Sequence, residues 1–127
     1  MRLVISNISG VPIYEQIKEQ IKAGILSGEI KEGEVLPSIR ILAKDLKISV
    51  ITTTRAYADL EQEGFVANVH GKGCYVLPVN NDLVREQLLR DIENGFLSVL
   101  NAARIAKVGK QELDNIFDHI CREEEYE

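Results

Sequence analysis

The chain has 127 residues, of which 45% are hydrophobic, so it fits one small folded domain with an appendage and is too apolar for a disordered chain. Its formal net charge is −5, no apolar run reaches membrane-spanning length, and the start, MRLVISNISG, lacks a signal-peptide pattern. Because its two cysteines, Cys74 and Cys121, form no CxxC or Cys/His pattern, the sequence favours a reduced, cytoplasmic protein without structural zinc.

The first third of the chain predicts one amphipathic helix between two irregular segments. Leu3–Ile5 could form a short strand or a packed arm. Pro12 suits the first turn of a helix, which then ends at Ser27-Gly28. Isoleucines recur every four residues along it, at Ile13, Ile17, Ile21 and Ile25. This helix is expected to support the core of the next segment, which it reaches through a loop at Ile30–Val35.

Residues 36–64 predict two short helices joined by a tight turn. Ser38 is a good N-cap for the first helix, Lys47-Ile48 forms the turn, and Ser49 caps the second helix. The second helix has one buried face, made by Thr53, Ala56, Tyr57 and Leu60. Gly64 closes it at the position where a left-handed residue ends a helix. Two helices of this kind, the second with one buried and one free face, form a helix-turn-helix.

A β-hairpin follows the second helix. Phe65–Val69 and Cys74–Leu77 read as strands, and His70-Gly71-Lys72-Gly73 forms a glycine-bearing tip between them. The hairpin is the wing of a winged helix-turn-helix. The expected fold is therefore mostly α with a small β wing, and residues 1–78 form a DNA-binding domain.

Residues 79–127 predict a short C-terminal helical segment for dimerisation. After Pro78 and Asn80-Asn81, a long helix starts at Asp82, the pattern breaks at Lys107–Gly109, and a last helix runs from Gln111 to about Glu123. Its apolar stripe is too large for two helices to cover, so we expect it to form a dimer interface. The expected interface residues are Val84, Leu88, Ile92, Phe96 and Val99. The alternative is that this segment packs back on its own winged helix.

Five fragments in order resemble a known family: PIYEQI, LPSIRILA, ITTTRAY, LEQEGFV and HGKGCYV. They resemble the winged-helix domain of GntR-type bacterial transcription regulators, over roughly residues 10–78 of this sequence. The R-A-Y at Arg55–Tyr57 and the short chain resemble the YtrA-like branch. The resemblance implies a repressor of a transporter operon, and it implies that Arg40, which matches the arginine of the family motif, contacts DNA. Val50 stands where many members of the family have an arginine.

Charge is distributed unevenly along the chain. Residues 1–77 hold nine Lys/Arg and nine Asp/Glu, whereas residues 78–127 hold six and eleven. Within Ser38–Ala58 the only acid is Asp45, and the bases are Arg40, Lys44, Lys47 and Arg55. Phosphate attraction depends on charges within about 10 Å at moderate salt. The helix-turn-helix is therefore expected to present a local positive patch to DNA.

The free face of the second helix carries the groups expected to read DNA. Arg55 can reach a phosphate or a guanine edge, and the methyl groups of Val50 and Ile51 can contact thymine methyl groups. Val50 packing back on the first helix is the alternative. At the wing, glycine lets the backbone approach the minor groove, and lysine and histidine supply charge. The expected DNA-binding residues are Arg40, Ser49, Val50, Ile51, Thr52, Thr54, Arg55, His70, Gly71 and Lys72.

Nothing in the sequence predicts a catalytic site, a metal site or a cofactor. His70 and His119 are far apart and lack partners at metal-ligand spacing. We therefore expect a sequence-specific regulator, a repressor, that binds a palindromic operator in double-stranded DNA as a homodimer. The alternative is a winged helix used only for protein contacts. About fifty residues follow the wing, too few for a sizeable effector cavity, so an effector would be small, bind between subunits or be absent.

Overall fold

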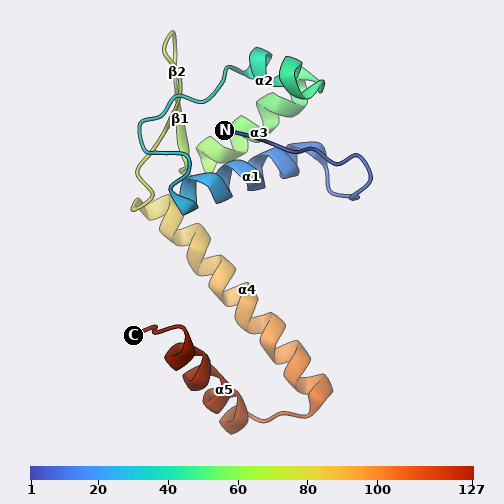
Figure 1. The fold of residues 1–127 in the computed structure, drawn as a ribbon, viewed down its shortest axis with the longest axis vertical. Coiled ribbons are helices and arrows are strands. Elements are labelled where there is room, and N and C mark those ends of the chain that lie inside the picture. The colour runs from blue at the N-terminus through green and yellow to red at the C-terminus, as the bar shows by residue number, and fades with distance from the viewer. The chain divides into compact units, whose positions relative to one another are not determined.

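The computed structural model describes residues 1–127 and contains five helices and one two-stranded sheet (Figure 1). Residue contacts divide the chain into an N-terminal unit, Met1–Gln87, and a C-terminal unit, Leu88–Glu127. None of the helices is long and apolar enough to cross a membrane. The elements are α1 Ile13–Ser27, α2 Ile39–Leu46, α3 Val50–Gln62, β1 Val66–Val69, β2 Gly73–Val76, α4 Asp82–Ala106 and α5 Lys110–Glu123.

The N-terminal unit is a winged helix-turn-helix built around α1 and α3, which lie side by side in Figure 1. The isoleucines expected on one face of α1 pack in one core with α3, three of them buried and Ile13 half-buried. The residues of α3 in this core are Ala56, Tyr57 and Leu60. Tyr57 also donates a hydrogen bond of 2.6 Å from its hydroxyl to the Pro37 carbonyl, which ties α3 to the start of α2. The buried core therefore fixes α3 through one face and leaves the other face free.

The wing is an antiparallel hairpin in which Val66 pairs with Val76 and Val69 pairs with Gly73. The segment expected as a loop at Ile30–Val35 contributes a further bridge, between Val35 and Tyr75. Backbone hydrogen bonds from Val76 to Glu34 and from Leu36 to Cys74, both 2.9 Å, support that bridge. The sequence pattern did not predict this bridge, because Gly33 and the charged residues of the segment lack the alternating apolar pattern of a strand.

The first residues form a packed arm rather than a strand. Leu3 and Ile5 pack against the core of the N-terminal unit. Gln20 exchanges two hydrogen bonds with the backbone of Val4, accepting from its N–H at 2.9 Å and donating to its carbonyl at 2.7 Å. Gln16 does the same with Ser6, at 2.8 Å in both directions. Side chains of α1 thus form the hydrogen bonds with the backbone of the arm that a neighbouring strand would form in a sheet.

The first turn of α4 belongs to the N-terminal unit. Val84 is completely buried in its core, so its expected place in a dimer interface is wrong. Asn81 caps α4 by accepting a 3.0 Å hydrogen bond from Val84 N–H, and its Nδ2 donates to the carbonyls of Gly64 and Pro78 at 3.0 and 2.6 Å. The N-terminal unit extends to Gln87, beyond the boundary expected at residue 78. It does so because the first turn of α4 completes its core.

The C-terminal unit contains the rest of α4 and the whole of α5. Its one buried residue is Ala103, and α5 has none. Phe96 of α4 and Phe117 of α5 lie 6.3 Å apart between ring centroids. Two helices with so little buried surface lack a core of their own.

Candidate nucleic-acid interface

The connection between α2 and α3 is short and held by caps at both helix starts. Ser38 Oγ accepts a hydrogen bond from Ile41 N–H, and Ser49 Oγ accepts one from Thr52 N–H. Between the helices, Lys47 adopts a left-handed backbone with φ 57°, and Ile48 N–H donates to the Ala43 carbonyl at 3.0 Å. These bonds fix the direction in which α3 leaves the turn, and so fix which residues it exposes.

The exposed face of α3 agrees with the helical register expected from the sequence. Thr53 is buried, whereas Thr54 and Arg55 are exposed. Ile51 is 82% exposed and Val50 is 42% exposed, so neither is absorbed into the core. A branched apolar side chain as exposed as Ile51 on a fixed helix is available for contact with another molecule.

The hydroxyl groups of α3 differ in what they can still donate. Thr54 Oγ1 donates to the Val50 carbonyl at 2.8 Å, and Thr53 Oγ1 donates to the Ser49 carbonyl at 3.2 Å. Ser49 Oγ donates to Thr52 Oγ1 at 2.8 Å, which leaves the hydroxyl proton of Thr52 free. Thr52 can therefore donate to a phosphate or a base, whereas Thr54 can only accept while its internal bond holds.

Five cations in and near the helix-turn-helix and wing have no acidic partner. They are exposed, and none of them forms an ion pair or a side-chain hydrogen bond: Arg40, Lys44, Lys47, Arg55 and Lys72. By contrast, Lys18 and Lys22 of α1 lie 3.4 and 3.0 Å from Glu63, so their charges are compensated inside the protein. Unpaired cations keep their full charge for an external anion such as a phosphate.

Arg55 has a further contact that the sequence did not reveal. Its Cζ lies 3.8 Å from the centroid of the Tyr14 ring in α1. Tyr14 lies in the first turn of α1, next to Ile13. Its place beside the apolar stripe of α1 indicates that it lies near the core, as it does, but does not indicate a contact with α3. Because the two residues are 41 positions apart, no local pattern could have joined them.

The tip of the wing is exposed and turns through glycine. Gly71 and Gly73 have φ of 78° and 109°, which favour glycine, and Lys72 N–H donates to the Val69 carbonyl at 2.9 Å. His70, Gly71 and Lys72 are all exposed, and Figure 1 shows the tip projecting clear of the helices. The wing can therefore present a backbone turn and a lysine to the same partner.

A carboxylate on α3 anchors the first strand of the wing, β1. Glu61 accepts hydrogen bonds from the backbone and side-chain amides of Asn68 in β1, at 2.9 and 3.2 Å. These two bonds hold the pKa of Glu61 below its ordinary value. The wing and the exposed helix are thus linked by a direct polar contact at the C-terminal end of α3.

Comparisons with known proteins agree with this arrangement. Residues 13–76 match the family described as bacterial regulatory proteins, gntR family. The HTH-type transcriptional repressor YtrA of Bacillus subtilis (strain 168) is 43% identical over 68 residues, which are 54% of this chain and 52% of YtrA. The chain thus aligns with about half of that relative's length.

Two solved structures extend the comparison. YtrA from Sulfolobus acidocaldarius, a GntR-family transcription factor, is 33% identical, covers 95% of this chain and 97% of its own, and has a TM-score of 0.57. The DNA-binding domain of AraR in complex with operator ORX1 is 26% identical, covers 60% of this chain and 95% of its own, and has a TM-score of 0.53. The chain belongs to the GntR family of bacterial regulatory proteins.

Proposed function

We propose that this protein is a cytoplasmic transcriptional repressor that binds an operator in double-stranded DNA. The observation that carries the proposal is the set of exposed cations without an acidic partner in the helix-turn-helix and wing. They lie next to α3, the reading helix, whose outer face is free. In this arrangement the N-terminal part of α3 enters the major groove, and the wing contacts the neighbouring backbone or minor groove. The AraR–operator complex supports the same use of a similar domain.

Contacts with phosphates and with bases have separate carriers in this proposal. Lys44, Lys47 and Lys72 position the protein on the duplex through phosphates, which carry no sequence information. Arg40, Arg55 and the front of α3 reach base edges. The front of α3 supplies hydrogen-bond acceptors, one free hydroxyl donor and methyl groups there. The residues that carry these groups are Ser49, Val50, Ile51, Thr52 and Thr54. The affinity for every duplex should therefore fall as the salt concentration rises. The preference for one DNA sequence over another should depend on α3.

We also propose that the C-terminal unit joins two copies of the chain. Leu88, Ile92, Phe96 and Val99 are between 37% and 54% exposed, although all four are large and apolar. An uncovered apolar stripe of this length marks an interface. A symmetric pair would bury the same stripe on both copies, which suits a regulator that needs two reading helices.

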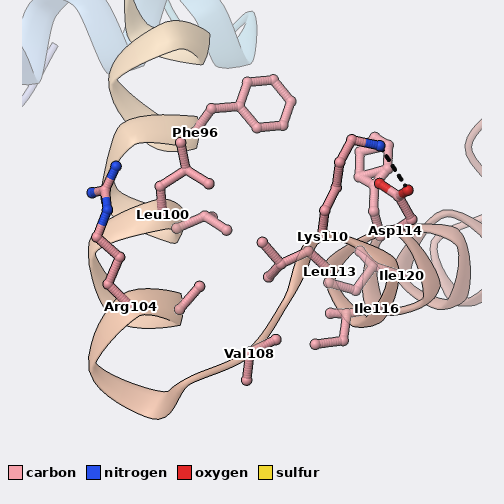
Figure 2. Close-up of a pocket in the computed structure, with 12 residues that line it drawn as sticks. Phe96, Leu100, Arg104, Val108, Lys110, Leu113, Asp114, Ile116 and Ile120 are labelled. Atoms are coloured by element: carbon pink, nitrogen blue, oxygen red, sulfur yellow. Dashed lines mark hydrogen bonds and ion pairs between the residues drawn. The ribbon is translucent and has the colours of Figure 1, made fainter.

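An open groove between α4 and α5 supports a second copy as the partner. The groove has a volume of about 680 Å³ and lies within the C-terminal unit. Figure 2 shows Phe96 and Leu100 on the side of α4 that faces Leu113 and Ile116 of α5. Its only marked ion pair, Lys110–Asp114 at 3.0 Å, is internally compensated, so the groove offers an apolar surface to an apolar partner.

A two-fold homodimer implies a palindromic operator. Two reading helices related by a two-fold axis contact half-sites about one helical turn apart, or a multiple of it, on one face of the duplex. The resemblance to the YtrA-like branch extends the proposal to an operon that encodes a transporter.

Selection from a random pool of duplex DNA tests the proposal. Bound sequences should converge on an inverted repeat, and affinity for the selected duplex should exceed affinity for a scrambled one at both low and moderate salt. Sedimentation of the complex should give two chains per operator. Absence of binding to any duplex would favour a winged helix that contacts only proteins. A single asymmetric half-site with one chain bound would contradict the dimer.

A further inference from the structure

The reading helix carries its arginine against an aromatic ring from another helix. Arg55 Cζ lies 3.8 Å from the centroid of Tyr14, which is close enough for a cation–π contact. Tyr14 is half-buried and packs against the core, whereas Arg55 is exposed. One partner is therefore fixed by the fold and the other is a long side chain that would otherwise move freely.

The contact leaves the donors of Arg55 available. The side chain of Arg55 makes no ion pair and no hydrogen bond within the chain, and the ring of Tyr14 is what it contacts. A guanidinium stacked on an aromatic face keeps N–H donors at its edge for a carboxylate, a phosphate or a base. The ring can thus hold the guanidinium without competing for the groups that bind DNA.

Tyr14 has no polar role that would explain the choice of tyrosine. Its hydroxyl makes no hydrogen bond within the chain. Tyr57 provides the contrast, because its hydroxyl donates to the Pro37 carbonyl and its ring is fully buried. The part of Tyr14 that acts on its surroundings is therefore the face of its ring.

We infer that Tyr14 is a positioning residue for operator recognition, which holds the Arg55 guanidinium in the orientation that contacts DNA. The inference rests on the proposed DNA binding. Ordering a free arginine side chain on the duplex costs conformational entropy, and a guanidinium already held on a ring loses less when it binds. Tyr14 itself need not touch the DNA.

A double-mutant cycle on the full-length protein tests this role. Affinities are measured for the selected operator and for a scrambled duplex of equal length, with wild type, Tyr14→Phe, Tyr14→Leu, Arg55→Ala and the Tyr14→Leu/Arg55→Ala pair. Tyr14→Phe should match wild type. Tyr14→Leu should weaken operator binding about two- to fivefold and leave the scrambled duplex unchanged. In the Arg55→Ala background, Tyr14→Leu should have no further effect.

Ile13→Ala is the matched control, because Ile13 packs on the same core from the same turn of α1 and has no aromatic ring to hold a guanidinium. It should lower thermal stability and leave operator preference unchanged. Equal losses from Tyr14→Leu with and without Arg55 would overturn the inference, as would a Tyr14→Leu protein with wild-type preference. Failure of wild type to bind any duplex would instead overturn the proposed function.

A second measurement applies even if Tyr14→Leu does not fold. Protons next to a guanidinium that lies over an aromatic ring shift upfield in the NMR spectrum. The Arg55 Hδ resonances of wild type should show this shift, and Tyr14→Phe should retain it. Ordinary Arg55 Hδ positions in the folded wild-type protein would overturn the inference by themselves.

Discussion

Individual residues at the front of α3 offer more methyl groups than free hydroxyl donors. Ile51 is 82% exposed, and the Thr54 hydroxyl is already committed to the Val50 carbonyl. Recognition by this helix should therefore depend strongly on apolar contact, and the base that offers a methyl group in the major groove is thymine.

Ile51→Ala tests this at a single residue. The substitution should weaken operator binding by about 1 kcal/mol, because it removes methyl and methylene groups buried against the DNA. Replacing each operator thymine in turn by uracil deletes only the base's methyl group. At least one thymine should matter for wild type and cease to matter for Ile51→Ala. An identical uracil profile for both proteins would contradict the contact.

Arg40 and Lys72 should respond to DNA sequence in different ways. Arg40→Ala should weaken specific binding by about 1–3 kcal/mol if the guanidinium reaches a base edge. Lys72→Ala should weaken binding to all duplexes alike and reduce the slope of affinity against salt by about 1. Titrations of operator and scrambled duplex at several salt concentrations separate the two effects. A uniform loss from Arg40→Ala would place Arg40 on a phosphate.

Cys74 should be chemically inert in the folded protein. Its side chain is 5% exposed, and burial, with the Glu61 charge, raises the pKa of its thiol to about 11. The thiolate is the reactive form of cysteine. Only a small fraction of Cys74 is thiolate at pH 8, well below its pKa, so Cys74 should react slowly at that pH. A Cys121→Ser variant isolates this thiol, which should react with a disulfide reagent only after denaturation. Rapid reaction of the native variant would contradict the burial.

At the scale of elements, the start of α4 depends on one side chain. Asn81 caps that helix and also donates to the carbonyls of Gly64 and Pro78. The space beside Gly64 is equally constrained: its φ is 87°, and a Cβ there would lie 2.5 Å from Leu83 Cβ. The end of α3 and the beginning of α4 are therefore joined by a close backbone approach and a shared amide.

Asn81→Ala should lower the free energy of unfolding by about 1–2 kcal/mol, since it removes a helix cap and leaves the Gly64 carbonyl without its donor. Asn80→Ala is the matched control, because the neighbouring Asn80 is exposed and makes no hydrogen bond. Urea unfolding measures both. Asn81→Asp keeps the cap acceptor and loses the donor, so its stability should lie between those of wild type and Asn81→Ala. Equal stabilities for all variants would show that the junction is not needed.

At the scale of the whole molecule, the C-terminal unit should determine the number of chains. Ile92→Asp with Phe96→Asp places two charges on the exposed apolar stripe and should yield a monomer. Loss of the tethered second half-site should then weaken operator binding by about 10²–10⁴-fold. Sedimentation and operator titration measure these outcomes.

Asn94→Asp with Ser98→Asp is the matched control for this pair. It adds the same charge at the same spacing, on the opposite face of α4, and should remain a dimer. A shortened chain ending at Gln87 should be folded and monomeric, and should bind a full operator no better than a half-site. A dimer formed by that shortened chain, or by the Ile92/Phe96 variant, would contradict the assignment.

The sequence predicted the elements well because their signals are local. Ser38 and Ser49 mark helix starts through bonds to residues three positions away, and both caps are present. The glycine-bearing tip of the hairpin was equally readable. The start of α5 differs by one residue, at Lys110 instead of Gln111. The fold class and the family were therefore predicted correctly.

The errors and omissions concern contacts between distant residues. Val84 continues the apolar period of Leu88 and Ile92, and periodicity cannot distinguish a residue buried in its own core from one left for a partner. The Val35–Tyr75 bridge and the Tyr14–Arg55 contact join residues 40 and 41 positions apart. The DNA-binding and dimer residues remain predictions, because their roles are defined by molecules outside the chain.

The attachment of the N-terminal arm has a consequence for how the sequence can diverge. Gln16 and Gln20 bind the backbone of Ser6 and Val4, so the bonds are indifferent to the identity of those two side chains. Val4 and Ile8 are 69% and 96% exposed. Substitutions at such outward positions could therefore accumulate without releasing the arm, and could give related regulators different outer surfaces. A single change of Gln16 would remove both bonds to Ser6, and a change of Gln20 both bonds to Val4. Tolerance to mutation is therefore concentrated in the arm, and intolerance in the helix that holds it.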